Sequence, residues 1–380
     1  MDFELSKEQK DIQKAAGEFA IGEIKDIALE YDQKEEFPME LWKKASELGF
    51  IGLYIKEEFG GGDLGVLEQS LVMEEFWKVD PGCGCILLTA FGSNAIQNFG
   101  TKEQKNKYIP PLSSGGAIMG TAITEPDAGS DVFGISTTAR KDGDDYVING
   151  SKMFVTSGTI ADYLAVFCVT DDRSSRTNQH SLILIETDRP GFEATKISGK
   201  MGIRASDTAE VALNDVRVPK ENLVGEEGQG FELIMHLFNF ARIEASAQGV
   251  GVAQGALDKA VAHMKKRQAF GRPIGTFQAL QFKVADMATM IECGRNLYYK
   301  AATRYDSGVV DRKLIAMSKW YCGEVGVRVT DEALQIHGGY GYIAEYDIER
   351  FYRAAKIVEI YEATKEIEKQ TVATAVLGKL

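Results

Sequence analysis

The sequence predicts an α+β protein of three successive domains: an N-terminal all-α domain (residues 1–113), a middle β-barrel or β-sandwich domain (114–230) and a C-terminal four-helix bundle (231–380). Helical periodicity at both ends of the chain, with short β-rich runs between them, carries this prediction. The chain has 380 residues, 44% of them hydrophobic and 26% charged. This is enough for two or three domains with sizeable cores, and the composition excludes disordered and fibrous proteins.

The first domain reads as a series of helices. Ser6-x-x-Gln9 forms a capping box, and apolar residues then recur at i, i+4 and i+7. A second helix has Pro38 in its first turn. Helical pattern continues, interrupted by glycine-rich loops, as far as Pro110-Pro111. These features predict a helical domain of roughly one hundred and ten residues.

The middle region is predicted to be all β. Asn149-Gly150 separates the β-rich runs 146–148 and 153–156, and because Asn-Gly suits a tight turn, we expect a hairpin there. Further strands are expected at residues 164–169, 181–185 and 210–218.

Long helical periodicity returns after Gly228-Gln229-Gly230. Breaks are expected at Arg272-Pro273 and at residues 338–341. The glycine cluster 249–255 lacks both the G-x-G-x-x-G spacing and a preceding strand, so we interpret it as close helix packing and not as a dinucleotide-binding turn. Leu280, Val284, Met287 and Ile291 mark the apolar face of one of these helices.

Charge and cysteine content narrow the function classes. A formal net charge of −13 disfavours nucleic acid and anionic membranes as partners. Neither a long apolar run nor a signal-peptide pattern is present, so no membrane insertion is expected. Five dispersed cysteines, an odd number, fit a reduced cytoplasm, and their spacing does not match a zinc or C-x-x-C redox site, so no metal is expected.

One loop is rich in groups that could contact a planar ligand. Residues 124–131, Thr-Glu-Pro-Asp-Ala-Gly-Ser-Asp, place hydroxyls, a proline and a glycine in one turn, although composition alone would also fit an ordinary surface turn. This octapeptide resembles the flavin-contacting loop of the acyl-CoA dehydrogenase family. Other segments resemble that family in the same order: residues 200–204, 214–219, 267–274, 277–278, 335–342 and 360–364.

The resemblance implies an enzyme that dehydrogenates an acyl-CoA thioester to the 2-enoyl-CoA with FAD as cofactor. Glu362 would abstract the α-proton, while the hydride passes from the β carbon to flavin N5. An ordinary glutamate, with a pKa of ~4.3, is a weak base for this step, so we expect desolvation by the bound acyl chain to raise it. Electron-transferring flavoprotein would accept the electrons, and a homo-oligomer, a tetramer, is implied.

The same resemblance assigns the binding residues. Cofactor-binding residues would be Thr124, Ser130, Phe154, Thr156, Arg267, Phe270, Gln278, Gln335, Gly338, Gly339, Thr364 and Glu366. Substrate-binding residues would be Ser130, Phe91, Asn239, Arg242 and Ala363.

Three of these residues depart from the family pattern. Asn239 stands for a common aspartate, Ala363 for glycine and Phe154 for tryptophan. The stretch 86–97, which would line the acyl end, contains no Lys or Arg, so a dicarboxylyl thioester is disfavoured. We expect a short, branched or alicyclic acyl group, with Phe91 limiting the depth of the pocket.

Two other functions stay open at this stage. An acyl-CoA oxidase or related flavin oxidase would share the fold and differ in how the reduced flavin is reoxidised. A flavin-free protein could use the same scaffold for binding or assembly.

Overall fold

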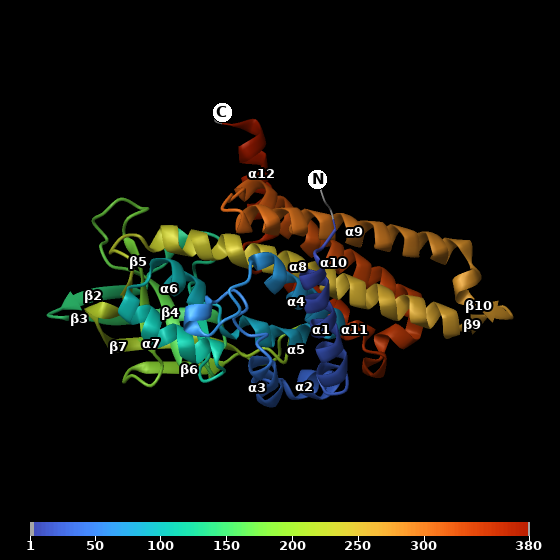
Figure 1. The fold of residues 1–380 in the computed structure, drawn as a ribbon, viewed down its shortest axis with the longest axis horizontal. Coiled ribbons are helices and arrows are strands. Elements are labelled where there is room, and N and C mark those ends of the chain that lie inside the picture. The colour runs from blue at the N-terminus through green and yellow to red at the C-terminus, as the bar shows by residue number, and fades with distance from the viewer. Residues whose placement is uncertain (1–3, 379–380) are drawn as a thin grey trace.

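The computed structural model describes residues 4–378. In chain order a β domain separates two helical regions, and in space it lies at one end of the molecule, on the left in Figure 1. The first helix opens with the predicted capping box, because Ser6 and Gln9 exchange side-chain-to-backbone hydrogen bonds. The N-terminal helices are α1 (Lys7–Phe19), α2 (Ala28–Lys34), α3 (Met39–Glu47), α4 (Val66–Val79), α5 (Pro81–Gly84), α6 (Ser93–Phe99) and α7 (Lys102–Ser113).

The middle domain is one eight-stranded, mostly antiparallel sheet. Its strand order is β6-β7-β3-β2-β4-β5-β8, and β1 pairs with β4 in parallel. The strands are β1 (Met119–Ala122), β2 (Thr138–Asp142), β3 (Asp145–Thr156), β4 (Tyr163–Val169), β5 (His180–Glu186), β6 (Phe192–Lys196), β7 (Thr208–Pro219) and β8 (Leu223–Val224).

The hairpin predicted at Asn149-Gly150 is wrong. These residues lie inside the continuous strand β3, and the turn falls earlier, where β2 ends at Asp142 and β3 begins at Asp145. The register of β3 against β7 shifts between Ile148 and Gly150, so the Asn-Gly pair forms an irregularity within the strand. The Asn149 side chain is bound across the sheet to Asp215, at 2.9 Å to Oδ1 and 2.9 Å to the backbone N–H.

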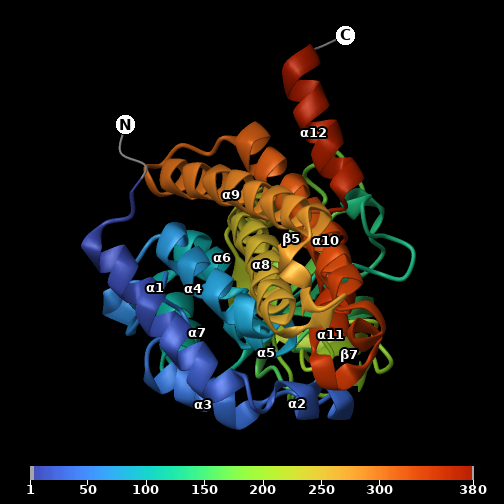
Figure 2. The ribbon, with the colours of Figure 1, turned by 90° about the vertical axis from the view of Figure 1, so that its right-hand side faces the viewer.

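The C-terminal domain is a bundle of long helices that packs beside α4 (Figure 2). Its helices are α8 (Gly230–Lys266), α9 (Gln278–Asp306), α10 (Arg312–His337), α11 (Ile348–Ala355) and α12 (Lys365–Leu377), with the short hairpin β9 (Gln268–Ala269) and β10 (Arg272–Pro273) between α8 and α9. The predicted breaks before α9 and after α10 are therefore confirmed.

Close packing explains the glycine cluster of α8, as predicted. A Cβ added to Gly249 would lie 2.4 Å from the carbonyl oxygen of Cys322 on α10. A Cβ added to Gly255 would lie 2.1 Å from the carbonyl oxygen of Lys78 on α4. Only glycine lets α8 approach both helices this closely.

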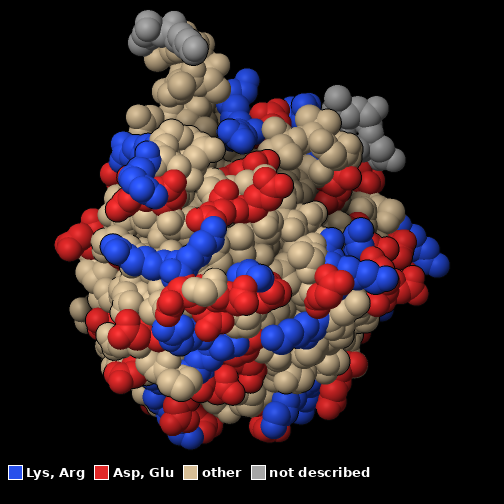
Figure 3. Space-filling model, turned by 90° about the vertical axis from the view of Figure 1, so that its left-hand side faces the viewer, with Lys and Arg blue, Asp and Glu red and all other residues tan. Residues whose placement is uncertain are grey.

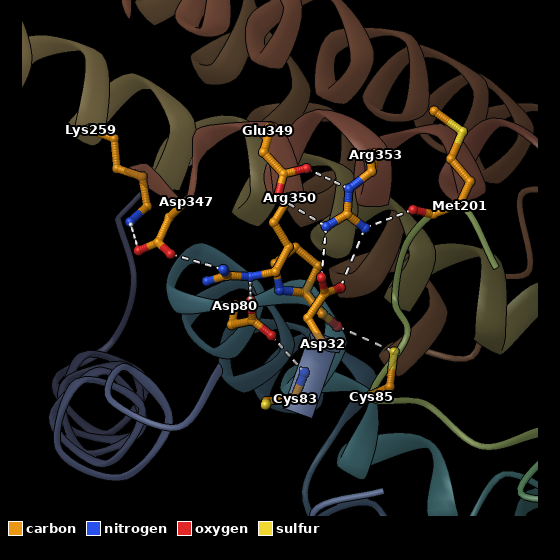
Figure 4. Close-up of polar contacts among 11 residues, drawn as sticks. Asp32, Asp80, Cys83, Cys85, Met201, Lys259, Asp347, Glu349, Arg350 and Arg353 are labelled. Atoms are coloured by element: carbon orange, nitrogen blue, oxygen red, sulfur yellow. Dashed lines mark hydrogen bonds and ion pairs between the residues drawn. The ribbon is translucent and has the colours of Figure 1, made fainter. Parts of the chain in front are cut away.

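A buried ionic network joins the three regions (Figure 4). Arg350 on α11 donates from Nε to Asp80 Oδ2 at 2.7 Å, and both side chains are almost fully buried. Arg353 on the same helix contacts Asp32 of α2 at 2.7 Å and the carbonyl oxygen of Met201 at 2.7 Å. This network fixes the bundle relative to the N-terminal helices and the β domain.

The surface carries both signs of charge. Figure 3 shows Lys and Arg interspersed with Asp and Glu over the face that includes the β domain. None of the described helices is long and apolar enough to cross a membrane.

Candidate active site

The predicted catalytic segment lies in an irregular turn between α11 and α12. Glu362 has φ of 54° and Ala363 has φ of 84°, a backbone region that side-chain-bearing residues rarely adopt. Two cations hold this turn by its carbonyl groups: Arg242 Nε donates to the Glu362 carbonyl at 3.0 Å, and Lys319 Nζ donates to the Ala363 carbonyl. The left-handed backbone at Ala363 is one that suits the glycine it replaces.

Arg242, Lys319 and Glu368 form a buried charge cluster beneath the turn. Arg242 Nε lies 3.0 Å from Glu368 Oε1, but its N–H points at the Glu362 carbonyl, so neither carboxylate oxygen of Glu368 has a hydrogen bond. Burial raises the pKa of Glu368 and lowers the pKa of Lys319. The sequence identified only Arg242 of these three, because nothing local distinguishes Lys319 or Glu368 from other helix charges.

The Glu362 carboxyl group has the properties of a general base. The residue is half-buried, and its Oε2 is fully enclosed without a hydrogen-bond partner in the described part of the chain. Burial raises its pKa to about 7, although the charges of Arg242 and Lys319 act in the opposite direction. The expected rise in pKa is therefore produced by the protein itself, before any acyl chain binds.

Glu362 opens onto a small cavity of about 40 Å³ between the β domain and the helices. A cavity of this size has room for a few water molecules. Three residues that the sequence predicted for this site, Phe91, Thr156 and Glu362, line the cavity together. The full lining of the cavity is Leu88, Phe91, Thr156, Ala241, Glu244, Ala245, Gln248, Tyr361 and Glu362.

Two polar lining residues were not predicted. Glu244 and Gln248 project from α8, four residues apart on one helix face. The Tyr361 hydroxyl donates to Gln248 Oε1. Because α8 is buried on nearly all sides, its sequence periodicity does not indicate which face borders a cavity.

A buried ion pair between Lys152 and Glu125 anchors the predicted flavin loop to strand β3. Lys152 Nζ lies 2.8 Å from Glu125 Oε1, and the other oxygen of Glu125 accepts from the Ser136 N–H at 2.7 Å. Glu125 is thereby turned inward, while Ser130 is exposed and Thr124 half-buried. The loop is joined to β3, because the Met153 N–H donates to the Thr124 carbonyl at 2.8 Å.

Phe154 projects from the same part of the sheet. It lies at a second irregularity of β3, with φ of 59°, and its side chain is 65% exposed. A bulge of this kind turns a side chain away from its regular face. An exposed aromatic ring on this strand fits the role predicted for Phe154, that of covering a planar ring.

The remaining predicted cofactor residues lie at the opposite end of α8. Arg267 follows Arg242 by 25 residues, or about 37 Å along the helix axis at ~1.5 Å per residue. Arg267 is exposed and lies over the ring of Tyr340 at 5.4 Å. Phe270, Gln278, Gln335, Gly338 and Gly339 are exposed as well. The length of α8 therefore separates Arg267 from Arg242 and the Glu362 turn that Arg242 holds.

The structure also places the three other residues predicted to bind cofactor or substrate, Asn239, Thr364 and Glu366. Asn239 is buried, and its Oδ1 has no partner within residues 4–378. Thr364 caps α12, since its hydroxyl accepts from the Ile367 N–H at 3.5 Å, and Glu366 is exposed in the first turn of that helix. Their contacts with a cofactor or substrate stay predictions.

Together these features define a class of protein. A half-buried carboxyl group with a raised pKa, a small cavity beside it and a sheet that presents an exposed aromatic ring are features that a flavin-dependent dehydrogenase requires. Family models for the acyl-CoA dehydrogenase N-terminal, middle and C-terminal domains match residues 6–116, 120–216 and 228–377. The chain belongs to the acyl-CoA dehydrogenase family.

Relatives along the full length agree. The chain is 43% identical to an acryloyl-CoA reductase (NADH) of Anaerotignum propionicum, covering 100% of this chain and 97% of the relative. It is 42% identical to a short-chain specific acyl-CoA dehydrogenase of Clostridium acetobutylicum, covering 98% and 99%.

Solved structures show the same fold. Butyryl-CoA dehydrogenase of Megasphaera elsdenii superposes with a TM-score of 0.96 at 40% identity, covering 99% of this chain and 100% of that one. A chain from a structure of the electron transferring flavoprotein of Acidaminococcus fermentans gives 0.97 at 42% identity, covering 100% of both.

Membership makes the protein an oxidoreductase with FAD as its cofactor. The residues present fit this cofactor. The sheet surface offers an exposed aromatic ring at Phe154, and a Cβ added at Gly338 or Gly339 would meet nothing within 4 Å, so the backbone there is open to a ligand.

Proposed function

We propose that the protein removes the α and β hydrogens of a short-chain acyl-CoA, with Glu362 as the base. The observation that carries the proposal is the enclosed, unpartnered Oε2 of Glu362 in a cavity that Thr156 of the sheet also lines. When bound, FAD supplies the hydride acceptor. The flavin-contacting residues predicted in residues 124–131 and at Phe154 would hold its ring beside this cavity.

The turn around Glu362 would perform two tasks. Its carboxylate takes the α-proton, for which a pKa of about 7 is well matched near neutral pH. Its N–H donates to no backbone carbonyl in the described part of the chain and can donate to the thioester carbonyl, stabilising negative charge there. Arg242 and Lys319, by holding the two carbonyls, fix the direction of that N–H.

The cavity supports a short acyl group. Leu88 and Phe91 provide its apolar lining, and a volume of about 40 Å³ disfavours a long chain. Branched or alicyclic groups of similar size belong to the same proposal. The lining contains no Lys or Arg, so a second carboxylate on the substrate would be desolvated without a partner.

The reverse reaction, reduction of a 2-enoyl-CoA, is a second candidate. A carboxyl group with a pKa of about 7 is partly protonated at neutral pH and can return a proton to the α carbon as readily as remove one. The relative from Anaerotignum propionicum is named a reductase, which supports this direction.

We also propose that the active protein is a homo-oligomer, a tetramer. Arg267 lies about 37 Å along α8 from Arg242 at ~1.5 Å per residue, which supports the supply of Arg267 to this site by a second copy. Helix α12 projects from the body of the chain (Figure 2), which leaves apolar side chains uncovered. Exposed apolar residues of the C-terminal domain include Phe270, Phe282, Tyr342, Val376 and Leu377.

Electron-transferring flavoprotein is the proposed electron acceptor. The structural similarity to a chain solved in a study of that flavoprotein supports this choice. Release of hydrogen peroxide in air, without an added carrier, would instead favour the oxidase alternative.

The decisive experiment is anaerobic reduction of the bound flavin, followed as bleaching of its yellow colour, with straight, branched and cyclic acyl-CoAs. Glu362→Gln should retain FAD and bind acyl-CoA, yet lose flavin reduction by about 10²–10⁴-fold. Glu18→Gln, at an exposed glutamate, is the matched control.

Normal reduction by Glu362→Gln would move the base elsewhere. Faster reduction by glutaryl-CoA than by every monoacyl thioester would refute the proposed substrate class. A colourless protein that does not take up FAD would favour the binding or assembly alternative.

A further inference from the structure

A second buried carboxyl group faces the acyl cavity. Glu244 lines the cavity together with Glu362, and only 4% of its surface is exposed. Among residues 4–378 no cation pairs with its carboxyl group, and burial raises its pKa. The Gln69 side chain is the polar group that hydrogen-bonds to it, and this contact acts in the opposite direction, lowering the pKa. An acid in this setting has unused hydrogen-bonding capacity directed at the cavity.

Helix α8 aims Glu244 at the acyl chain. Ala241, Glu244, Ala245 and Gln248 follow one another at i, i+3, i+4 and i+7, so they form one face of the helix, and all four line the cavity. Ala241 and Ala245 are small, and Gln248 accepts a hydrogen bond from Tyr361. Glu244 is therefore the acidic group that this helix presents to a bound acyl group.

Within residues 4–378, no cation compensates this carboxyl group, and its polar neighbour is the uncharged Gln69 amide. The cavity lining contains no Lys or Arg. The two nearby cations, Arg242 and Lys319, are directed at the carbonyls of Glu362 and Ala363 and at Glu368. A buried acid without a charged partner costs stability, and a structural role would require a charged partner. A ligand group is the missing partner.

We propose that Glu244 is a specificity-determining residue that binds a protonated amine carried by the acyl chain beyond its β carbon. The substrate class is then a short amino-substituted acyl-CoA. An ammonium group fits better than a hydroxyl, because it stabilises the ionised form of Glu244 by a hydrogen bond between charged groups, whereas a hydroxyl offers one uncharged donor only. This inference rests on the proposed function, since Glu362 remains the base.

The test compares two isosteric thioesters, 4-aminobutyryl-CoA and pentanoyl-CoA, in which an ammonium and a methyl group occupy the same place. The amine is kept acidic until mixing so that it does not cyclise, and flavin reduction of the holoenzyme is followed anaerobically by stopped flow. Glu244→Gln should lower the ratio of kcat/KM for the amine to kcat/KM for pentanoyl-CoA at least tenfold, as expected for loss of a hydrogen bond between charged groups.

Glu75→Gln is the control variant. Burial also raises the pKa of Glu75, but this residue does not line the cavity, so the ratio should stay at the wild-type value. 4-Hydroxybutyryl-CoA provides a third probe. An equal loss for this hydroxyl compound and for the amine would assign a general hydrogen-bond acceptor and overturn the choice of an amine.

Two other outcomes would overturn the inference. An unchanged ratio in Glu244→Gln would show that the carboxylate does not contact the acyl chain. Loss of reduction by both thioesters, with FAD retained, would make Glu244 part of the proton transfer. Failure of the proposed dehydrogenase function would be distinguishable from failure of the Glu244 proposal, because then no acyl-CoA would reduce the flavin of the wild-type protein.

Discussion

Replacing Glu244 by glutamine should stabilise the protein, increasingly so at high pH. Burial and the charge of Glu362 raise the pKa of Glu244 from 4.5 to about 8. A carboxyl group with a raised pKa in the folded state contributes stability below its unfolded pKa, and this stability is lost as the pH rises through the folded pKa. At ~1.36 kcal/mol per pKa unit, the loss reaches about 1 kcal/mol at pH 5, about 3 at pH 7 and about 5 at pH 9.

The difference in stability between Glu244→Gln and wild type should therefore grow by about 4 kcal/mol between pH 5 and pH 9, because glutamine does not titrate. With an unfolding entropy of ~2.1 cal/mol/K per residue, this corresponds to a relative shift in Tm of about 5 °C. Thermal unfolding of both proteins would be measured at equal protein and FAD concentrations, since ligand binding and assembly also change Tm.

Glu359→Gln provides a control of opposite sign. Burial acts to raise the pKa of Glu359, but the hydrogen bonds and charges of Lys356 and Lys365 outweigh it and lower the pKa. This carboxylate contributes stability above its unfolded pKa, so Glu359→Gln should be less stable than wild type at neutral pH, with a difference that shrinks in acid. If the Tm difference between Glu244→Gln and wild type did not change with pH, Glu244 would not be a desolvated acid.

Three further predictions follow from the structure. The kcat/KM of flavin reduction should rise with pH through about 7, because Glu362 must lose its proton to act as the base, and a flat profile between pH 5.5 and 9 would contradict the pKa assigned to it. Gly255→Ala should lose about 1–3 kcal/mol or more in urea unfolding, since its Cβ would lie 2.1 Å from a backbone oxygen, whereas Gly22→Ala, with nothing within 4 Å, should be neutral. Arg350→Met should cost about 3–5 kcal/mol by leaving Asp80 buried and unpaired, and a double variant that also carries Asp80→Asn should recover part of that loss in the same measurement.

Local sequence signals correctly predicted the features that depend only on neighbouring residues. The capping box at Ser6 and the breaks around Arg272-Pro273 depend on neighbouring residues, and the structure confirms both. The Asn149-Gly150 hairpin failed because long-range pairing of β3 with β7, together with the bond from Asn149 to Asp215, outweighed the local turn preference. Turn propensity cannot report a partner strand that lies sixty residues away.

The sequence by itself determined the family through its ordered motifs, and it singled out Glu362 and Phe91, which the structure places in one cavity. Tertiary structure alone decided the surroundings of Glu362: its positive φ, the cations from two helices that bind the carbonyls of Glu362 and Ala363, and the enclosure of its Oε2. It alone also placed Glu244 in the cavity. Desolvation depends on every atom packed around a group, and those atoms come from segments that the linear sequence leaves far apart.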